Sequence, residues 1–342
     1  MKALFTLPQI SVVLPFFNAE NTLHKAIESI QNQTFSNWEL ILVNNASTDK
    51  SPEIAKLFSK KDNRIIIVNE PKKGIVEALN TGLSYCKAPY IARMDADDIS
   101  LPSRLELQYN FMHQNTEVDL CSGLVQHFSE TENNTSGYKI YVDWINKLIT
   151  HQDIRLNQFV ESPLAHPSVM FRKQSLKKYG TYSDGDFPED YEMWLRWLNN
   201  GAQFFKLKQE ILIWYDSPDR LSRNDSKYSK VAFNKTRIYY LDKWLKKNNP
   251  FYPHLWIWGA GKIGKKLAKQ LSLKGHQIIS FIDICPKKAK QKNCIHYSDI
   301  PKAGHCFIVN FVATRGTATL IKNELFRKNY TEGKDFIMAA GL

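Results

Sequence analysis

The sequence predicts an α/β protein: a mostly parallel sheet with flanking helices, followed by a second, smaller α/β domain. Apolar runs that suit buried strands alternate with segments of helical periodicity through the first 113 residues. A separate segment that reads as strand, glycine-rich turn and helix begins at Leu255, after a break at Asn248–Pro253. Strand–helix alternation is typical of parallel strands joined by right-handed crossovers, so both observations favour the same fold class.

The elements of the first part follow in order along the chain. Continuous apolar runs predict strands at Ile10–Phe16, Trp38–Val43, Arg64–Val68, Tyr90–Met94 and Val118–Phe128. Helical spacing of apolar residues predicts helices around Leu23–Ile30, Ile54–Phe58, Ile75–Tyr85 and Leu101–His113. Each of the first three predicted strands is followed by a predicted helix, which is the order a parallel sheet requires.

The middle of the chain is less regular. Residues 129–160 are polar and are predicted to be irregular, with an exposed loop at 130–137, and residues 216–225 are rich in turn formers. The remaining expectations are a strand at Ser168–Arg172, a helix at Tyr191–Leu198, a strand pair at Gln203–Leu207 and Glu210–Tyr215, and a connecting helix at Lys230–Lys247. We therefore expect a domain over 1–225, a helical connector over 226–250 and a small domain over 251–342.

Composition indicates an ordinary globular chain. The chain has 342 residues, 43% hydrophobic and 23% charged, without an apolar run near the roughly 18 residues of a spanning helix. The start, Met1–Leu14, is a poor signal peptide. Five scattered cysteines without a CxxC pair indicate neither a zinc site nor a disulfide framework. A cytoplasmic setting fits these features best.

The net charge of +12 is concentrated near the end of the chain. Residues 251–342 hold 15 Lys and Arg against 5 Asp and Glu. Such an excess of positive charge is informative about binding partners, but not about the fold. Lysines at 262, 265, 266, 269, 287, 288, 290 and 292 form either a solvated surface or a contact with anionic lipid headgroups. Nucleic acid is a less suitable partner, because no basic groove with aromatic stacking residues is apparent.

Three carboxylates in four residues, Asp95, Asp97 and Asp98, follow the fourth predicted strand. Like charges crowded at a strand end repel one another unless a cation lies between them, and Mg²⁺ or Mn²⁺ prefers such oxygen ligands. Ligands of open α/β sheets bind beside the carboxyl ends of strands. The alternative is an acidic turn that caps the next helix, with Asp98 or Ser100 as N-cap.

Three further segments complete a candidate nucleotide-diphosphate site: Val13–Glu20, Ile41–Asp49 and Pro188–Arg196. The first two end successive strands and share an edge with the acidic cluster. There, Phe17 can stack on a base, Asn45 can hydrogen-bond a base edge, and a metal ion at Asp97 can hold a diphosphate.

The order and spacing of these four segments resemble the family 2 glycosyltransferases of the GT-A fold, over about residues 8 to 225. The resemblance implies a mostly parallel GT-A sheet and donor-binding residues at Pro15, Phe17, Asn18, Glu20, Asn45, Asp49, Gly74, Asp95, Asp97 and His166. Asp95 and Asp97 match the DxD motif, with Asp97 as the direct metal ligand and Asp95 nearer the ribose. Phe17 replaces the usual tyrosine, and Asn44 and Asn45 replace a common pair of aspartates, which weakens an assignment of uridine.

The resemblance also implies a catalytic base. Asp190, with Glu189 beside it, matches the carboxylate that removes a proton from the acceptor hydroxyl in an inverting transfer. The alternative for both residues is a helix N-terminus stabilised by acidic side chains. His166 faces either the diphosphate or the acceptor, or is a satisfied structural histidine. Gly74 precedes a helix whose N-terminus favours an anion.

The C-terminal segment carries a dinucleotide-binding fingerprint. Gly259, Gly261 and Gly264 lie between a predicted strand and helix, and the next strand, Gln277–Ile282, ends in Asp283. With only about 90 residues and no evident hydride-transfer partner, the segment resembles small Rossmann-like modules appended to sugar-modifying enzymes. It is either a second nucleotide site or a purely structural module.

Together these features predict a metal-dependent inverting glycosyltransferase. It would move a sugar from a nucleotide-diphosphate donor to a hydroxyl of a glycan or lipid-linked acceptor in surface polysaccharide synthesis, with peripheral contact at the inner face of the membrane as a further expectation. A sugar nucleotidyltransferase is one alternative, although Pro15–Asn18 is not its glycine-rich basic loop. A non-catalytic nucleotide-sugar sensor that uses the C-terminal fingerprint is the other.

Overall fold

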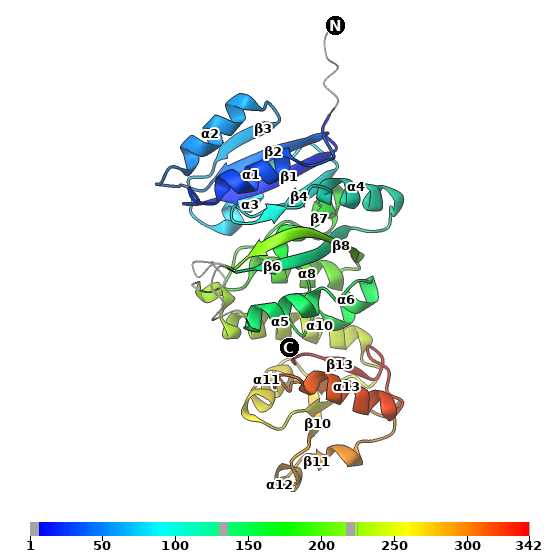
Figure 1. The fold of residues 1–342 in the computed structure, drawn as a ribbon. Coiled ribbons are helices and arrows are strands. Elements are labelled where there is room, and N and C mark those ends of the chain that lie inside the picture. The colour runs from blue at the N-terminus through cyan, green and yellow to red at the C-terminus, as the bar shows by residue number, and fades with distance from the viewer. Residues whose placement is uncertain (1–6, 130–135, 217–222, 224, 342) are drawn as a thin grey trace. The chain divides into compact units, whose positions relative to one another are not determined.

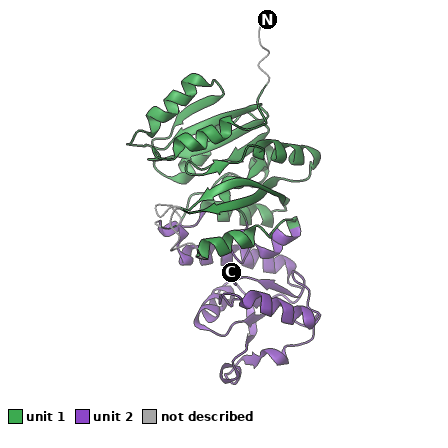
Figure 2. Cartoon of the chain, viewed as in Figure 1, with its two compact units in different colours: residues 1–151, 164–185, 189–224 green, residues 152–163, 186–188, 225–342 purple. Residues whose placement is uncertain are grey.

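The computed structural model describes residues 7–129, 136–216, 223 and 225–341, and the chain divides into two compact units. Unit 1 comprises residues 1–151, 164–185 and 189–224, and unit 2 comprises residues 152–163, 186–188 and 225–342 (Figure 2). Most of the predicted loop at 130–137 and of the turn-rich segment 216–225 lies outside the described residues.

Unit 1 is built on an eight-stranded mixed sheet with the strand order β3-β2-β1-β4-β7-β6-β8-β5 (Figure 1). Its strands are β1 (Ile10–Phe16), β2 (Trp38–Asn44), β3 (Ile65–Asn69), β4 (Tyr90–Arg93), β5 (Ile99–Ser100), β6 (Leu120–Phe128), β7 (Met170–Arg172) and β8 (Phe204–Tyr215). Strands β3, β2, β1 and β4 are parallel, whereas β7 is antiparallel to both β4 and β6. The predicted α/β class and its mostly parallel sheet are confirmed.

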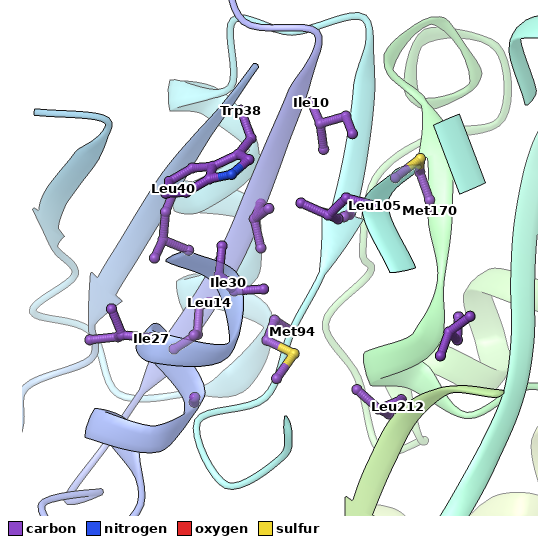
Figure 3. Packing of buried hydrophobic residues seen from close by; sticks show 14 of the residues in the cluster. Ile10, Leu14, Ile27, Ile30, Trp38, Leu40, Met94, Leu105, Met170 and Leu212 are labelled. Atoms are coloured by element: carbon purple, nitrogen blue, oxygen red, sulfur yellow. The ribbon is translucent and has the colours of Figure 1, made fainter. Parts of the chain in front are cut away.

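Helices flank this sheet. They are α1 (Leu23–Gln31), α2 (Ser51–Lys61), α3 (Ile75–Tyr85), α4 (Arg104–Gln114), α5 (Ser136–Ile145), α7 (Lys173–Tyr179) and α8 (Glu189–Asn199). Apolar residues of α1 pack against the strands, as the side chains of Ile27 and Ile30 beside Leu14 and Leu40 show (Figure 3). The buried cluster continues across β4 to Met170 and Leu212, so the parallel and the mixed parts of the sheet share one core.

Two expectations about the middle of the chain were wrong. Residues 129–160 are not wholly irregular, because they contain α5 and α6 (His151–Asn157). Helix α5 presents an aromatic face, and the rings of Tyr138 and Tyr141 contact Trp214 of β8. The expected pair at 203–215 is one continuous strand, β8, whose exposed Lys208–Glu210 segment looks like a turn in the sequence.

The alternative for the acidic cluster, in which Asp98 or Ser100 caps the next helix, is wrong. The chain first pairs Ile99 and Ser100 with β8 as strand β5, and α4 begins only after Ser103. Asp98 instead points into the fold and accepts a hydrogen bond from the backbone N–H of Tyr215 at 2.9 Å. Asp98 therefore joins the end of β4 to β8 rather than capping a helix.

Unit 2 contains a five-stranded, fully parallel sheet with the order β11-β10-β9-β12-β13. Its strands are β9 (His254–Trp258), β10 (Gln277–Asp283), β11 (Cys294–His296), β12 (Ile308–Asn310) and β13 (Phe336–Met338). Its helices are α10 (Lys230–Asn248), α11 (Lys262–Ser272), α12 (Pro286–Ala289) and α13 (Thr317–Arg327). Helix α10 joins this unit through Trp244, whose ring contacts Phe159 and Phe307. The three-part division at 225 and 250 stays a prediction.

Within the described residues, every helix is too short or too polar to cross a membrane.

Candidate active site

The carboxyl ends of β1, β2 and β4 meet at one edge of the sheet of unit 1, because these strands are parallel neighbours. The loops that follow β1 and β2 are joined by hydrogen bonds. Asn18 Oδ1 accepts from the backbone N–H of Thr48 at 2.8 Å, and Asp49 Oδ2 accepts from the N–H of Glu20 at 2.9 Å. Glu20 in turn accepts from the N–H of Lys50 at 3.0 Å. The structure thus brings Asn18, Glu20 and Asp49 together as cross-links between the two loops.

Asn45 holds a third loop at the same edge. Its Nδ2 donates to the carbonyl oxygens of Glu70 and Lys72 at 3.2 and 2.7 Å, and its Oδ1 accepts from the N–H of Gly74 at 2.9 Å. Both amide hydrogens are therefore used inside the protein. Only the second lone pair of Oδ1 remains available for the predicted hydrogen bond with a nucleotide base. Gly74 precedes α3 with φ 146, a conformation that favours glycine.

Phe17 offers an open ring beside these loops. Its side chain is 48% exposed, and Lys73 Nζ lies 4.9 Å from the ring centroid. Pro15 is buried in β1, opposite Val43. Phe17 can thus stack on a base with one face and contact a lysine with the other, whereas Pro15 shapes the strand end that presents it.

The acidic cluster at the end of β4 has the donor atoms of a divalent cation site. Asp95, Asp97 and Asp98 each offer a carboxylate oxygen, and these oxygens lie within 4.8 Å of one another. Asp95 and Asp97 are partly exposed, whereas Asp98 is 1% exposed. Hard oxygen donors at this spacing suit Mg²⁺ or Mn²⁺, with room for further ligands from solvent or a diphosphate. The residues present fit the predicted metal ion.

Two buried arginines that the sequence analysis missed support this cluster. Arg93, the last residue of β4, is 4% exposed and forms an ion pair with Asp95 through Nη1. Arg104 is fully buried and donates from Nη2 to the carbonyl oxygen of Arg93 at 2.7 Å. Burial, and then the charge of Arg93, lower the pKa of Arg104 to about 9. The sequence does contain one sign of this arrangement, because Arg93 is a charged residue at the end of an otherwise apolar strand.

The candidate base lies at the start of α8. Glu189 is buried, and Asp190 Oδ1 accepts from the N–H of Tyr191 at 2.7 Å. Burial, and then the negative charge of Glu189, raise the pKa of Asp190. A carboxyl group with a raised pKa suits general-base chemistry near neutral pH.

His166 links this acidic pair to a tyrosine. Its Nδ1 lies 3.9 Å from Glu189 Oε1, and its Nε2 hydrogen-bonds Tyr182 Oη at 2.7 Å. Burial, and then the charge of Arg93, hold the pKa of His166 well below its usual value, so the imidazole is neutral. His166 was predicted from the sequence and Tyr182 was not, because the spacing of the two residues follows no periodic pattern.

Arg93 connects the two acidic groups of the site. It pairs with Asp95 directly, and its charge also acts on Asp190, His166 and Tyr182. One buried guanidinium therefore pairs with Asp95 of the DxD segment and acts electrostatically on Asp190.

The glycine-rich turn of unit 2 is likewise assembled around Asp283. The backbone N–H of Ala260 donates to Asp283 Oδ2 at 3.2 Å, and Lys288 Nζ lies 3.1 Å from the same oxygen. Gly264 packs directly against the carbonyl oxygen of Gly259, whereas an added Cβ at Gly261 would meet no atom within 4 Å. The fingerprint residues are thus brought together, with Asp283 already bound to the turn.

The chain is similar in sequence to several known glycosyltransferases. The chain matches an uncharacterized glycosyltransferase of Methanocaldococcus jannaschii, MJ1057, at 32% identity over 73% of this chain and 84% of that protein. It matches the O-antigen biosynthesis glycosyltransferase WbnJ of Escherichia coli at 32% identity, over 70% of this chain and 91% of WbnJ. The fold is similar to that of Staphylococcus aureus TarS 1–349, solved with UDP-GlcNAc. The TM-score is 0.53 and the identity 16%, over 69% of this chain and 66% of that one.

Fold and sequence together define a glycosyltransferase with a GT-A-like core. The sequence model of glycosyl transferase family 2 matches residues 11–180, and the chain belongs to this family.

Proposed function

We propose that the protein is a metal-dependent inverting glycosyltransferase that uses a nucleotide-diphosphate sugar as donor. The observation that carries this proposal is that Arg93 pairs with Asp95 of the DxD segment while its charge also acts on Asp190. One group of carboxylates suits the diphosphate end of a donor, and the other suits the acceptor hydroxyl.

In this proposal, Asp190 removes the proton of the acceptor hydroxyl as that oxygen attacks the anomeric carbon and the bond to the diphosphate breaks. Bound Mg²⁺ or Mn²⁺ supplies charge compensation for the departing diphosphate. Asp97 holds that ion, and Asp95 lies toward the ribose. Burial, and then the charge of Glu189, keep the pKa of Asp190 raised, and the neutral His166 offers a hydrogen bond rather than a charge.

The nucleotide base of the donor would stack on Phe17, with Asn45 Oδ1 beside it as a hydrogen-bond acceptor. Asn18, Glu20 and Asp49 hold the loops of this pocket, and Gly74 lets the backbone N–H groups of the α3 N-terminus approach the diphosphate. The acceptor is proposed to be a glycan or a lipid-linked intermediate of surface polysaccharide synthesis, which the name of WbnJ supports.

The test is a screen of nucleotide-diphosphate sugars by thermal shift with Mn²⁺ or Mg²⁺, followed by donor hydrolysis and transfer assays. A bound donor raises the melting temperature by mass action. Asp190→Asn should abolish turnover while donor binding persists, and Asp97→Asn should abolish the metal-dependent shift. Glu53→Gln, at an exposed acid of α2, is the matched control. If no donor shifts the melting temperature, or Asp190→Asn retains wild-type turnover, the proposal fails.

The glycine-rich turn of unit 2 is proposed as a second nucleotide site, formed by Gly259, Gly261, Gly264 and Asp283. Its support is the strand–turn–helix context and the parallel sheet around it. The basic surface of the same unit is proposed to bring the protein to the cytoplasmic face of an anionic membrane. Cosedimentation with phosphatidylglycerol vesicles at low and high salt tests this contact, and absence of binding at low salt would contradict it.

A further inference from the structure

Arg93 is an unusual residue for the end of a central strand. Its side chain is 4% exposed, and its backbone is fixed by hydrogen bonds to Val169 and Arg104. Among the described residues, its Nε has no hydrogen-bond acceptor. A buried guanidinium with an unused donor is costly unless a further hydrogen-bond acceptor, for which an anion is well suited, completes its environment.

The guanidinium reaches into the acidic cluster. Nη1 pairs with Asp95 Oδ1, and Asp95 is the residue of the pair with the more accessible side chain, 23% against 5% for Arg93. Asp95 is also one of the three carboxylates whose oxygens lie within 4.8 Å of one another. The same carboxylate is thus placed to serve either an internal cation or a divalent ion.

We propose that Arg93 is a positioning residue that competes with the divalent ion for Asp95 in the empty site, and that the donor diphosphate relieves this competition. This inference rests on the proposed donor site. When a nucleoside diphosphate enters, its oxygens complete the environment of Arg93, and Asp95 turns toward the ion or the ribose. Metal and nucleotide therefore bind with positive coupling, and the metal alone binds weakly.

The charges explain the direction of the expected effect. A monovalent cation beside Asp95 repels a divalent ion and occupies one of its ligands, so its removal strengthens metal binding to the empty site. The same removal takes away the group that links metal to diphosphate, so the gain in metal affinity caused by a nucleotide falls.

The experiment measures the affinity for Mn²⁺ alone, and for Mn²⁺ with UDP or GDP, by electron paramagnetic resonance of free Mn²⁺. Arg93→Met should tighten binding of Mn²⁺ alone by about fivefold or more and reduce the gain from nucleotide by a similar factor. Arg93→Lys keeps the charge and should stay within about twofold of wild type. Arg64→Met removes a cation paired with Asp62 elsewhere in the same unit and should leave Mn²⁺ affinity unchanged.

A second measurement follows the wild-type protein and needs a variant, the charge-conserving Arg93→Lys, only to assign the signal. The Nε–H signal of Arg93 in arginine-labelled protein, assigned by its loss in Arg93→Lys, should shift when Mg²⁺ and UDP or GDP are added together. An unchanged signal at saturation, or Arg93→Met with wild-type or weaker affinity for Mn²⁺, overturns the inference. If wild-type protein binds no Mn²⁺ with or without nucleotide, the proposed function fails as well, which separates the two outcomes.

Discussion

His166 and Tyr182 are joined by a buried hydrogen bond of 2.7 Å between Nε2 and Oη, and the other ring nitrogen of His166 faces Glu189 at 3.9 Å. This pair connects the turn before β7 with the segment before α8, which carries the candidate base. A neutral histidine held by a tyrosine that stays protonated fixes one wall of the site without adding a charge to it.

Tyr182→Phe should therefore lower kcat clearly, although it should lower the free energy of unfolding only modestly. The change leaves His166 Nε2 without its tyrosine partner, which should lower the free energy of unfolding by about 1–2 kcal/mol. Loss of the fixed imidazole should lower kcat further, with little change in donor binding. Tyr179→Phe is the matched control, since its buried hydroxyl donates to Asp119 at 3.3 Å, outside the candidate site. Equal kcat in the two variants would contradict a role for the pair.

The pH profile should report the environment of Asp190. Its pKa is raised by burial and by Glu189, so kcat/KM should rise with pH through a limb above the usual aspartate range. Glu189→Gln removes the like charge and should move this limb about half to one pH unit lower. An unmoved limb in Glu189→Gln would show that Glu189 does not set the pKa of Asp190.

The same pKa predicts a stability effect of definite sign. The native protein holds the Asp190 proton more tightly than the unfolded chain does, so this group stabilises the fold at low pH. That stability is lost as pH rises through the native pKa. Asp190→Asn should remove this loss and flatten the melting temperature against pH in metal-free buffer. A slope identical to that of wild type would argue against a raised pKa.

Asp97 and Asp98 should separate metal binding from folding, although they are neighbours in the sequence. Asp98 is 1% exposed, accepts from Tyr215 N–H, and its charge acts on both Arg93 and Arg104. Asp98→Asn should cost about 2–4 kcal/mol of unfolding free energy, because it removes a counter-charge of two buried cations. Asp97→Asn should cost under about 1 kcal/mol and abolish the stabilisation by Mn²⁺. Chemical denaturation with and without Mn²⁺ measures both effects, and a reversed order would refute the assignment.

The sequence was sufficient for much of this arrangement because the signals were local. Strands β1 to β4 are apolar runs, and the acidic cluster follows one of them directly. The electrostatic centre of the site was not predictable in the same way. The Arg93 guanidinium pairs with Asp95 and its carbonyl oxygen accepts from Arg104, and only the three-dimensional fold brings Arg104 back to the strand.

The missed helix α5 has a similar cause. Its aromatic residues find their partner, Trp214, about 70 residues later, so the polar composition around them dominated the prediction. For Asn45, the sequence suggested a ligand contact where the structure shows a mainly structural role. Its residue type suggests a base contact, but most of its hydrogen-bonding capacity holds the 70–74 loop.

The glycines of unit 2 allow its fold and its proposed ligand site to be tested separately. A Cβ on Gly264 would overlap the carbonyl oxygen of Gly259, so Gly264→Ala should destabilise unit 2 by roughly 1–3 kcal/mol or more. Gly261 has φ −76 and no neighbour within 4 Å of an added Cβ, so Gly261→Ala should leave the melting temperature nearly unchanged.

If unit 2 binds a nucleotide through this turn, the new methyl group obstructs the phosphate approach, and Gly261→Ala weakens binding at least about tenfold. Isothermal titration with nucleotides, in an Asp97→Asn background that silences the site of unit 1, measures this loss. A Gly261→Ala protein with unchanged affinity would exclude the turn as the binding site, whatever its fingerprint suggests.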